Sequence, residues 1–140
     1  MMNNKRPLLL TLPITVKTYD VDFANIVHNA VYIRWLEDMR QLIIEEYYSM
    51  AQALADGRSP ILTRTDIQYK WPIRFGDRVE GQMWLSRLSR TKWVVEAEIT
   101  ANGEVAATAV QSGYFADLKT LRPVRIPDSL RVVWEVAQEP

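Results

Sequence analysis

The stretch NAVYIRWLEDMRQLIIEEYYSMAQALAD, residues 29–56, decides the fold. Its apolar residues recur every three or four positions, which places them on one stripe of a single long helix. The stripe comprises Leu36, Met39, Ile43, Tyr47, Met50 and Leu54, widened by Trp35, Leu42, Ile44 and Tyr48. So broad an apolar face predicts a helix that a sheet wraps around. Asn29 is a candidate cap at its start, and Gly57 stands where the helix is expected to end.

Segments with a period of two lie on both sides of this helix. Residues 8–19 alternate weakly and predict a first strand, in which Pro13 favours an edge position or a bulge. After Gly57 the alternation predicts four further strands, at residues 61–69, 79–88, 92–100 and 105–117. Asn102-Gly103 is typical of a two-residue hairpin turn, because both residues tolerate a positive φ. The tail, with Pro123 and Pro127, is expected to be irregular.

Consecutive strands joined by short turns form an antiparallel sheet. The order of elements therefore predicts an α+β fold, in which an antiparallel five-stranded sheet wraps around one long central helix. No repeat, linker or low-complexity segment divides residues 1–140, so we expect one domain.

Composition excludes several classes of function. The chain has 17 Lys and Arg, 17 Asp and Glu, one His and no Cys. A net charge of zero argues against a general nucleic-acid-binding protein, which needs a basic excess. The lack of Cys excludes a disulfide framework and a thiol nucleophile, and one His without neighbouring ligands does not predict a metal site. With no targeting or membrane-spanning segment in the sequence, we expect a cytoplasmic protein.

The segment between the first strand and the helix carries the chemistry. Asp20 and Asp22 stand two residues apart shortly before the helix begins. A helix start offers unpaired N–H groups, and a carboxylate beside such donors is an arrangement that acyl transfer requires. Taken alone, however, Asp and Asn are also common turn and cap residues, so the spacing leaves both interpretations open.

Several motifs in order along residues 14–130 resemble the hotdog-fold acyl-CoA thioesterases of the 4-hydroxybenzoyl-CoA thioesterase type. The first is Tyr19-Asp20-Val21-Asp22 with its loop, followed by Tyr32-Ile33-Arg34-Trp35-Leu36-Glu37 in the helix. The second is Ile67-Gln68-Tyr69 followed by Pro72-Ile73-Arg74-Phe75-Gly76-Asp77. The third runs from Tyr114 to Val124, with Ile126-Pro127 after it. The resemblance implies a hotdog fold and a thioester hydrolase that releases a carboxylic acid and CoA.

The resemblance also implies roles for particular residues. Asp22 takes the position of the catalytic carboxylate, which acts as a nucleophile or as a general base on water. The Asn29 backbone amide takes the position of the oxyanion donor, aided by Val27 or His28. His28 is either a partner of Asp22 or a loop residue without a catalytic role. Asn25 stands where many relatives have Gly, and Asn is the next-best residue at positive φ.

Further residues are candidates for substrate binding. Tyr19 and Tyr32 flank the loop, either as substrate contacts or as ordinary strand-end and core aromatics. Residues 14–56 carry a net charge of −4, from three basic and seven acidic residues, whereas residues 58–92 carry +5, from eight basic and three acidic. Arg87, Arg90 and Lys92 cluster at one predicted turn, and the phosphates of CoA favour such side chains.

The resemblance implies a homodimer or a tetramer of dimers with the site between subunits. CoA enters only as part of the substrate, so no other cofactor is expected. Two alternatives remain open. One is an acyl-CoA- or acyl-carrier-binding hotdog protein without catalysis, motivated by Asn25 and Asn29. The other is a hotdog dehydratase or hydratase, whose pattern around His28 is not matched.

Overall fold

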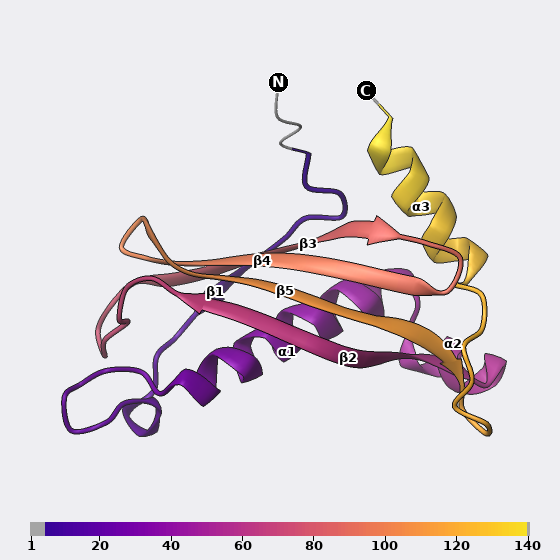
Figure 1. Ribbon diagram of the computed structural model, residues 1–140. Helices are drawn as coiled ribbons and strands as arrows, with labels where there is room; N and C mark the ends of the chain where they lie inside the picture. The colour runs from indigo at the N-terminus through magenta and orange to yellow at the C-terminus, as the bar shows by residue number, and fades with distance from the viewer. Residues whose placement is uncertain (1–4, 140) are drawn as a thin grey trace.

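The computed structural model describes residues 5–139. Five strands form one antiparallel sheet in the order β1-β3-β4-β5-β2. The strands are β1 (Leu10–Ile14), β2 (Arg58–Tyr69), β3 (Val79–Leu88), β4 (Lys92–Ala101) and β5 (Glu104–Asp117). The helices are α1 (Asn29–Tyr47), α2 (Met50–Asp56) and α3 (Asp128–Gln138), and a 3₁₀ turn, η1, covers Thr18–Asp20. Figure 1 shows the curved sheet lying over α1, which confirms the predicted α+β architecture.

The buried stripe of α1 holds the two layers together. Leu36 and Met39 are fully buried, as are Met83 on β3 and Ile99 on β4. Gly81 on β3 lies so close to α1 that an added Cβ would sit 2.6 Å from the Met39 sulfur. The helix therefore packs against the middle of the sheet, as its broad apolar face predicts.

The long helix predicted over residues 29–56 is interrupted. Ser49 begins α2 with a capping box, in which its hydroxyl accepts the Gln52 N–H at 3.2 Å. The Tyr48 hydroxyl donates to Asp56 at 2.8 Å, which fixes the bend. Because α2 turns away, Met50 and Leu54 are each 68% exposed, and the expectation that they extend the buried stripe was wrong.

Two other predictions about the elements need correction. The first strand is confined to Leu10–Ile14, since the chain then leaves the sheet for η1. The tail is not irregular, because it ends in α3, whose Leu130 is buried and whose Trp134 indole donates to the Leu85 carbonyl at 2.8 Å. Pro123 and Pro127 suggested an irregular tail, but Pro127 occupies the N-cap position of α3, where a proline does not interrupt the helix.

Several turn predictions are confirmed. β1 is an edge strand, as Pro13 indicates. Asn102 and Gly103 both have positive φ, 53° and 86°, in the hairpin between β4 and β5. Gly57 ends α2 in the left-handed region, with φ 70°. No helix within residues 5–139 is long and apolar enough to cross a membrane.

Candidate active site

The loop between η1 and α1, residues 21–28, is a small hairpin held to the rest of the protein by backbone hydrogen bonds. We call it the Asp22 loop. Val21 and Val27 form an antiparallel bridge, and the Asp22 N–H donates to the Ile26 carbonyl at 3.0 Å. The His28 N–H donates to the Asp20 carbonyl at 3.0 Å. These bonds hold Asp20 beside His28, the residue before α1, and Asp22 beside Ile26 in the loop that leads into α1.

The two aspartates have different environments. Asp20 is 5% exposed, and its carboxylate accepts the Lys17 N–H at 2.8 Å, which closes η1. Asp22 is exposed, and one of its carboxylate oxygens accepts the N–H groups of Ala24 and Ile26 at 2.9 and 3.0 Å. Within residues 5–139 the second oxygen of Asp22 has no hydrogen-bond partner. Asp20 thus supports the fold, whereas Asp22 presents a free carboxylate oxygen at the surface.

A second loop, residues 72–77, clamps the Asp22 loop. Ile26 bridges to Arg74, whose guanidinium donates to the Ala24 carbonyl at 3.2 Å. Asn25 adopts φ 61°, as predicted, and its side-chain oxygen accepts the Phe75 N–H at 3.2 Å. Glycine has no side chain to make this last bond, so Asn25 contributes both the turn and a link between the loops.

The start of α1 supplies unpaired backbone donors. Three amides were candidates for the oxyanion donor. The Val27 amide donates to the Ile73 carbonyl at 2.8 Å, and the His28 amide donates to the Asp20 carbonyl. The Asn29 amide, by contrast, has no acceptor among the described residues. It is the first residue of α1, where the positive end of the helix dipole favours an anion.

Asn29 is therefore not the helix cap that the sequence suggests. The cap position belongs to His28, with φ −62° and ψ 141°, and its side chain makes no capping hydrogen bond. Both His28 and Asn29 have exposed side chains. The Asn29 carbonyl accepts the Tyr69 hydroxyl at 3.1 Å, which ties the helix start to the end of β2.

Aromatic side chains surround this site. Tyr32 is buried and packs edge-on against Tyr69, with ring centroids 5.0 Å apart. Burial raises the pKa of the Tyr32 hydroxyl, opposed in part by a hydrogen bond with the Ile73 backbone, so the group stays protonated. Four further aromatics at this end are largely exposed: Tyr19, Phe23, Trp71 and Phe75. Tyr69 and Phe75 belong to the second family motif without a predicted role, and nothing in the sequence pointed to Phe23 or Trp71.

The predicted basic cluster lies at the other end of the sheet. Arg87, Arg90 and Lys92 surround the β3–β4 turn, whereas the Asp22 loop bridges to residues just before β3 begins. A ten-residue strand such as β4 spans about 33 Å at 3.3 Å per residue. One chain therefore does not bring this cluster to Asp22. Figure 1 shows the separation, with the β3–β4 turn close to α3 and the indigo loop at the opposite end.

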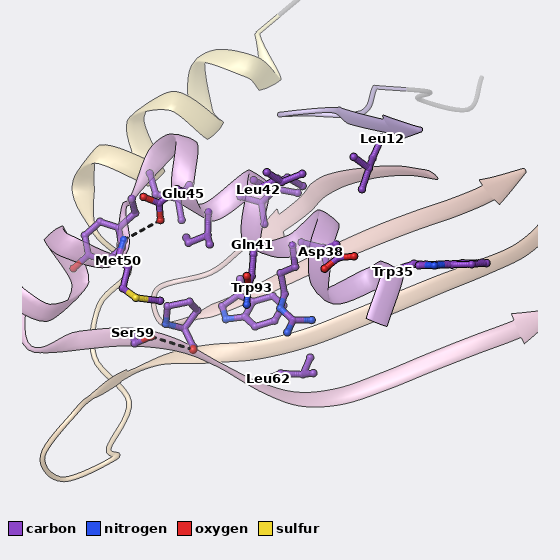
Figure 2. Close-up of a pocket in the computed structure, with 18 of the residues that line it drawn as sticks. Leu12, Trp35, Asp38, Gln41, Leu42, Glu45, Met50, Ser59, Leu62 and Trp93 are labelled. Atoms are coloured by element: carbon purple, nitrogen blue, oxygen red, sulfur yellow. Dashed lines mark hydrogen bonds between the residues drawn. The ribbon is translucent and has the colours of Figure 1, made fainter. Parts of the chain in front are cut away.

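An apolar cavity of about 800 Å³ lies along α1. Figure 2 shows Leu12 of β1 and Leu62 of β2 on either side of the helix, with Trp93 from the sheet between them.

Within residues 5–139, no group of three or more His, Asp or Glu side chains is arranged to hold a metal ion.

Comparison with known proteins identifies the family. The profile of the thioesterase-like superfamily matches residues 16–133. The chain belongs to this superfamily. The FadM long-chain acyl-CoA thioesterase of Escherichia coli K12 is 27% identical over 120 residues, 84% of this chain and 91% of FadM. These findings confirm the family resemblance and the enzyme class predicted from it, a thioester hydrolase.

Solved structures agree on the fold. The DHNA-CoA thioesterase of Staphylococcus aureus superposes with a TM-score of 0.83 at 21% identity, covering 93% of this chain and 91% of that one. A thioesterase of Thermus thermophilus, solved with coenzyme A and Zn, gives a TM-score of 0.78 at 23% identity and covers 99% of both chains. The chain therefore has the hotdog fold of these thioesterases.

Proposed function

We propose that this protein hydrolyses an acyl-CoA thioester to a free carboxylic acid and CoA, with Asp22 as the catalytic carboxylate. One observation carries the proposal: Asp22, with a free carboxylate oxygen, lies in the loop that leads into a helix whose first amide, that of Asn29, has no acceptor among the described residues. Carboxylate and N–H donor are the two groups that acyl transfer needs.

The reaction follows from these two groups. The thioester carbonyl oxygen accepts the Asn29 N–H, and the helix dipole stabilises the negative charge that develops there. In one route Asp22 attacks the carbonyl carbon and gives an anhydride that water hydrolyses. In the other, Asp22 removes a proton from a water molecule while that water attacks the carbonyl carbon. In both routes the C–S bond breaks, CoA leaves as a thiolate that takes a proton, and the acid is released. No group beyond substrate and water is required.

We further propose that the working unit is a homodimer joined through β2. This strand lies at the edge of the sheet and pairs with β5 on one side only. A free edge is a template for another strand, and a twofold axis makes two such edges antiparallel. The Arg58 end of one β2 would then lie beside the Tyr69 end of the other. That arrangement brings the basic end of one subunit toward Asp22 of its partner, where it could bind CoA phosphates.

The apolar cavity along α1 favours an extended acyl group. Its lining is largely hydrocarbon and aromatic, and its volume of about 800 Å³ exceeds what a short acyl group fills. The long-chain acyl-CoA activity in the name of E. coli FadM points the same way.

The test is a panel of aliphatic and aromatic acyl-CoAs given to the purified protein and to Asp22→Ala. Thiol release by the wild type, abolished in the variant, supports the proposal. Tight binding without turnover across the panel would overturn it in favour of the acyl-CoA-binding alternative. Hydration of an enoyl-CoA without thiol release would instead indicate a hydratase.

A further inference from the structure

The cavity along α1 is lined mainly by apolar residues, with a minority of polar and charged ones that includes Arg40. Arg40 projects from the middle of α1 and is half-buried. Its guanidinium donates to the side-chain oxygen of Gln111 on β5 at 2.8 Å. Gln111 is 1% exposed and donates in turn to the Thr65 hydroxyl on β2 at 3.1 Å. Three elements thus contribute to a partly buried polar relay, centred on the buried Gln111, that orients one cation.

The relay leaves most of the guanidinium unsatisfied. Arginine carries five N–H donors, and for Arg40 only the bond to Gln111 is made within residues 5–139. No carboxylate among these residues lies within 4.0 Å of it. Burial lowers the pKa of Arg40 and the more distant Glu37 raises it, but an arginine side chain remains protonated in proteins. A half-buried cation with spare donors therefore lines a largely apolar cavity, which is costly unless an acceptor binds there.

The acidic residues that also line the cavity do not supply this acceptor. Asp38 and Glu45 lie on the side of α1 away from Arg40, given 3.6 residues per turn, and both are exposed. Figure 2 labels both of them on α1. They form the solvent side of the cavity, whereas Arg40 points toward β5 and β2.

The position of Arg40 sets the length of a ligand that reaches it. Arg40 follows Asn29 by 11 residues in the same helix, or about 17 Å at 1.5 Å per residue. If the thioester carbonyl lies at the start of α1, a short acyl group ends well before Arg40. An acyl group that runs from there along α1 into the cavity, whose lining on this helix begins at Trp35, meets the guanidinium only with its far end and only if it is long.

We propose that Arg40, oriented by Gln111, binds an oxygen at the far end of a long acyl group and so makes the enzyme selective for ω-oxidised acyl-CoAs. This inference rests on the proposed thioesterase function and adds the substrate class. A carboxylate is the best match, because it pairs with a guanidinium through charge-assisted hydrogen bonds. An ω-hydroxyl offers a single neutral acceptor and is the weaker match.

The experiment compares three thioesters of equal length: hexadecanoyl-CoA, ω-hydroxyhexadecanoyl-CoA and hexadecanedioyl-CoA. Each is assayed with the wild type, Arg40→Met, Gln111→Leu and Arg34→Met. Arg34 is an exposed arginine of the same helix, so its variant controls for the loss of an α1 arginine. Circular dichroism and size-exclusion chromatography check the fold and the oligomeric state of each variant.

For the wild type we expect kcat/KM to be about 10- to 100-fold higher for hexadecanedioyl-CoA than for hexadecanoyl-CoA, the range of a charge-assisted hydrogen bond, with the hydroxyl compound between them. Arg40→Met should abolish this ratio by lowering the value for the diacid alone. Gln111→Leu should reduce the ratio, because the guanidinium loses its orienting acceptor, and Arg34→Met should leave it unchanged.

Equal use of the three substrates by the wild type would overturn the proposal. So would an equal loss for all three in Arg40→Met, or a change in its oligomeric state, since either result indicates a structural role. Non-hydrolysable S-alkyl CoA analogues with and without a terminal carboxylate separate this inference from the proposed function. If no thioester is hydrolysed but Arg40 still favours binding of the carboxylated analogue, the catalytic proposal fails and the binding site stands.

Discussion

The two ends of the sheet differ in how they are built. At one end, the Asp22 loop, residues 72–77 and the start of α1 are joined by backbone hydrogen bonds, and aromatic side chains surround them. At the other end, exposed arginine and lysine side chains surround the β3–β4 turn. The first end has groups suited to chemistry and the second has charge suited to an anion. Since one chain keeps them a strand length apart, a substrate that needs both must be bound by two chains.

The largest effect should come from the Asp22 end. Asp22→Asn keeps the shape of the side chain and its bonds to Ala24 and Ile26 while removing the charge. We expect kcat to fall about 10³-fold, the range for loss of a catalytic base or nucleophile, with no change in the unfolding midpoint. Steady-state kinetics and urea unfolding measure the two quantities. A variant that retains more than a tenth of wild-type kcat would remove Asp22 from the mechanism.

Asn29→Pro deletes one backbone N–H at the same end. Proline is favoured at the first helical position, and the extended conformation of His28, φ −62° and ψ 141°, suits the residue before a proline. The helix should therefore form, while the oxyanion donor is lost and kcat falls about 10²-fold. Asn29→Ala, which keeps the amide, is the control and should retain most of the activity. Similar losses in both variants would instead implicate the Asn29 side chain.

The opposite end should affect binding rather than chemistry. Removing both cations in Arg90→Ala/Lys92→Ala should raise KM for acyl-CoA about tenfold with little change in kcat, and added salt should shrink the difference. The thioester of N-acetylcysteamine, which lacks the phosphates, should be used equally by wild type and variant. Mixing this variant with Asp22→Asn should restore part of the activity, because one mixed-dimer site then contains both intact groups. If mixing restores nothing, the two ends do not share a site.

A variant of Asp20 tests the difference in role between Asp20 and Asp22. Because its buried carboxylate accepts the Lys17 N–H, Asp20→Ala leaves that amide without its partner. The free energy of unfolding should fall by about 1–2 kcal/mol. Chemical denaturation measures this loss, and Asp22→Ala serves as the comparison that should show a smaller one. The reverse order of stabilities would exchange the roles we assign to the two aspartates.

The smallest effect concerns Asp117 at the basic end. Backbone N–H groups of Thr120 and Lys119 donate to its carboxylate and hold its pKa below the usual value. A carboxyl group whose pKa is lowered in the folded state stabilises the protein at pH values above the usual carboxyl pKa. This contribution disappears as the pH falls through the lowered pKa. Asp117→Asn should therefore be slightly less stable than wild type at neutral pH, with the gap closing in acid. A gap that widens in acid would contradict this assignment.

The sequence predicts the sheet better than the ends of its elements. Period-two alternation locates β3 to the residue, and Asn102-Gly103 locates a turn, because both signals are local. The break at Tyr48 was missed because Met50 and Leu54 continue the helical spacing, although Ser49 and Gln52 form a local capping box that marks the start of a second helix. The α3 helix was missed because two prolines precede it.

The sequence predicts a site residue only where the amino-acid type itself indicates the role. Asp22 and the positive φ of Asn25 follow from motif and propensity. The Asn29 amide stands out only once the Val27 and His28 amides are seen to be engaged, which depends on contacts with Ile73 and Asp20. Arg40 was overlooked because its importance lies in a bond to Gln111, 71 positions away.

The clamp between the Asp22 loop and residues 72–77 also bears on how the chain folds. The bond from Arg74 to Ala24 closes over 50 residues that include α1, α2 and β2. Contacts so distant in sequence carry the entropy cost of closing a long loop, and such contacts slow folding. In a refolding experiment we therefore expect the active site to form late. Recovery of catalytic activity would then report completion of the native topology, and not the earlier formation of α1, the helix that supplies the Asn29 amide.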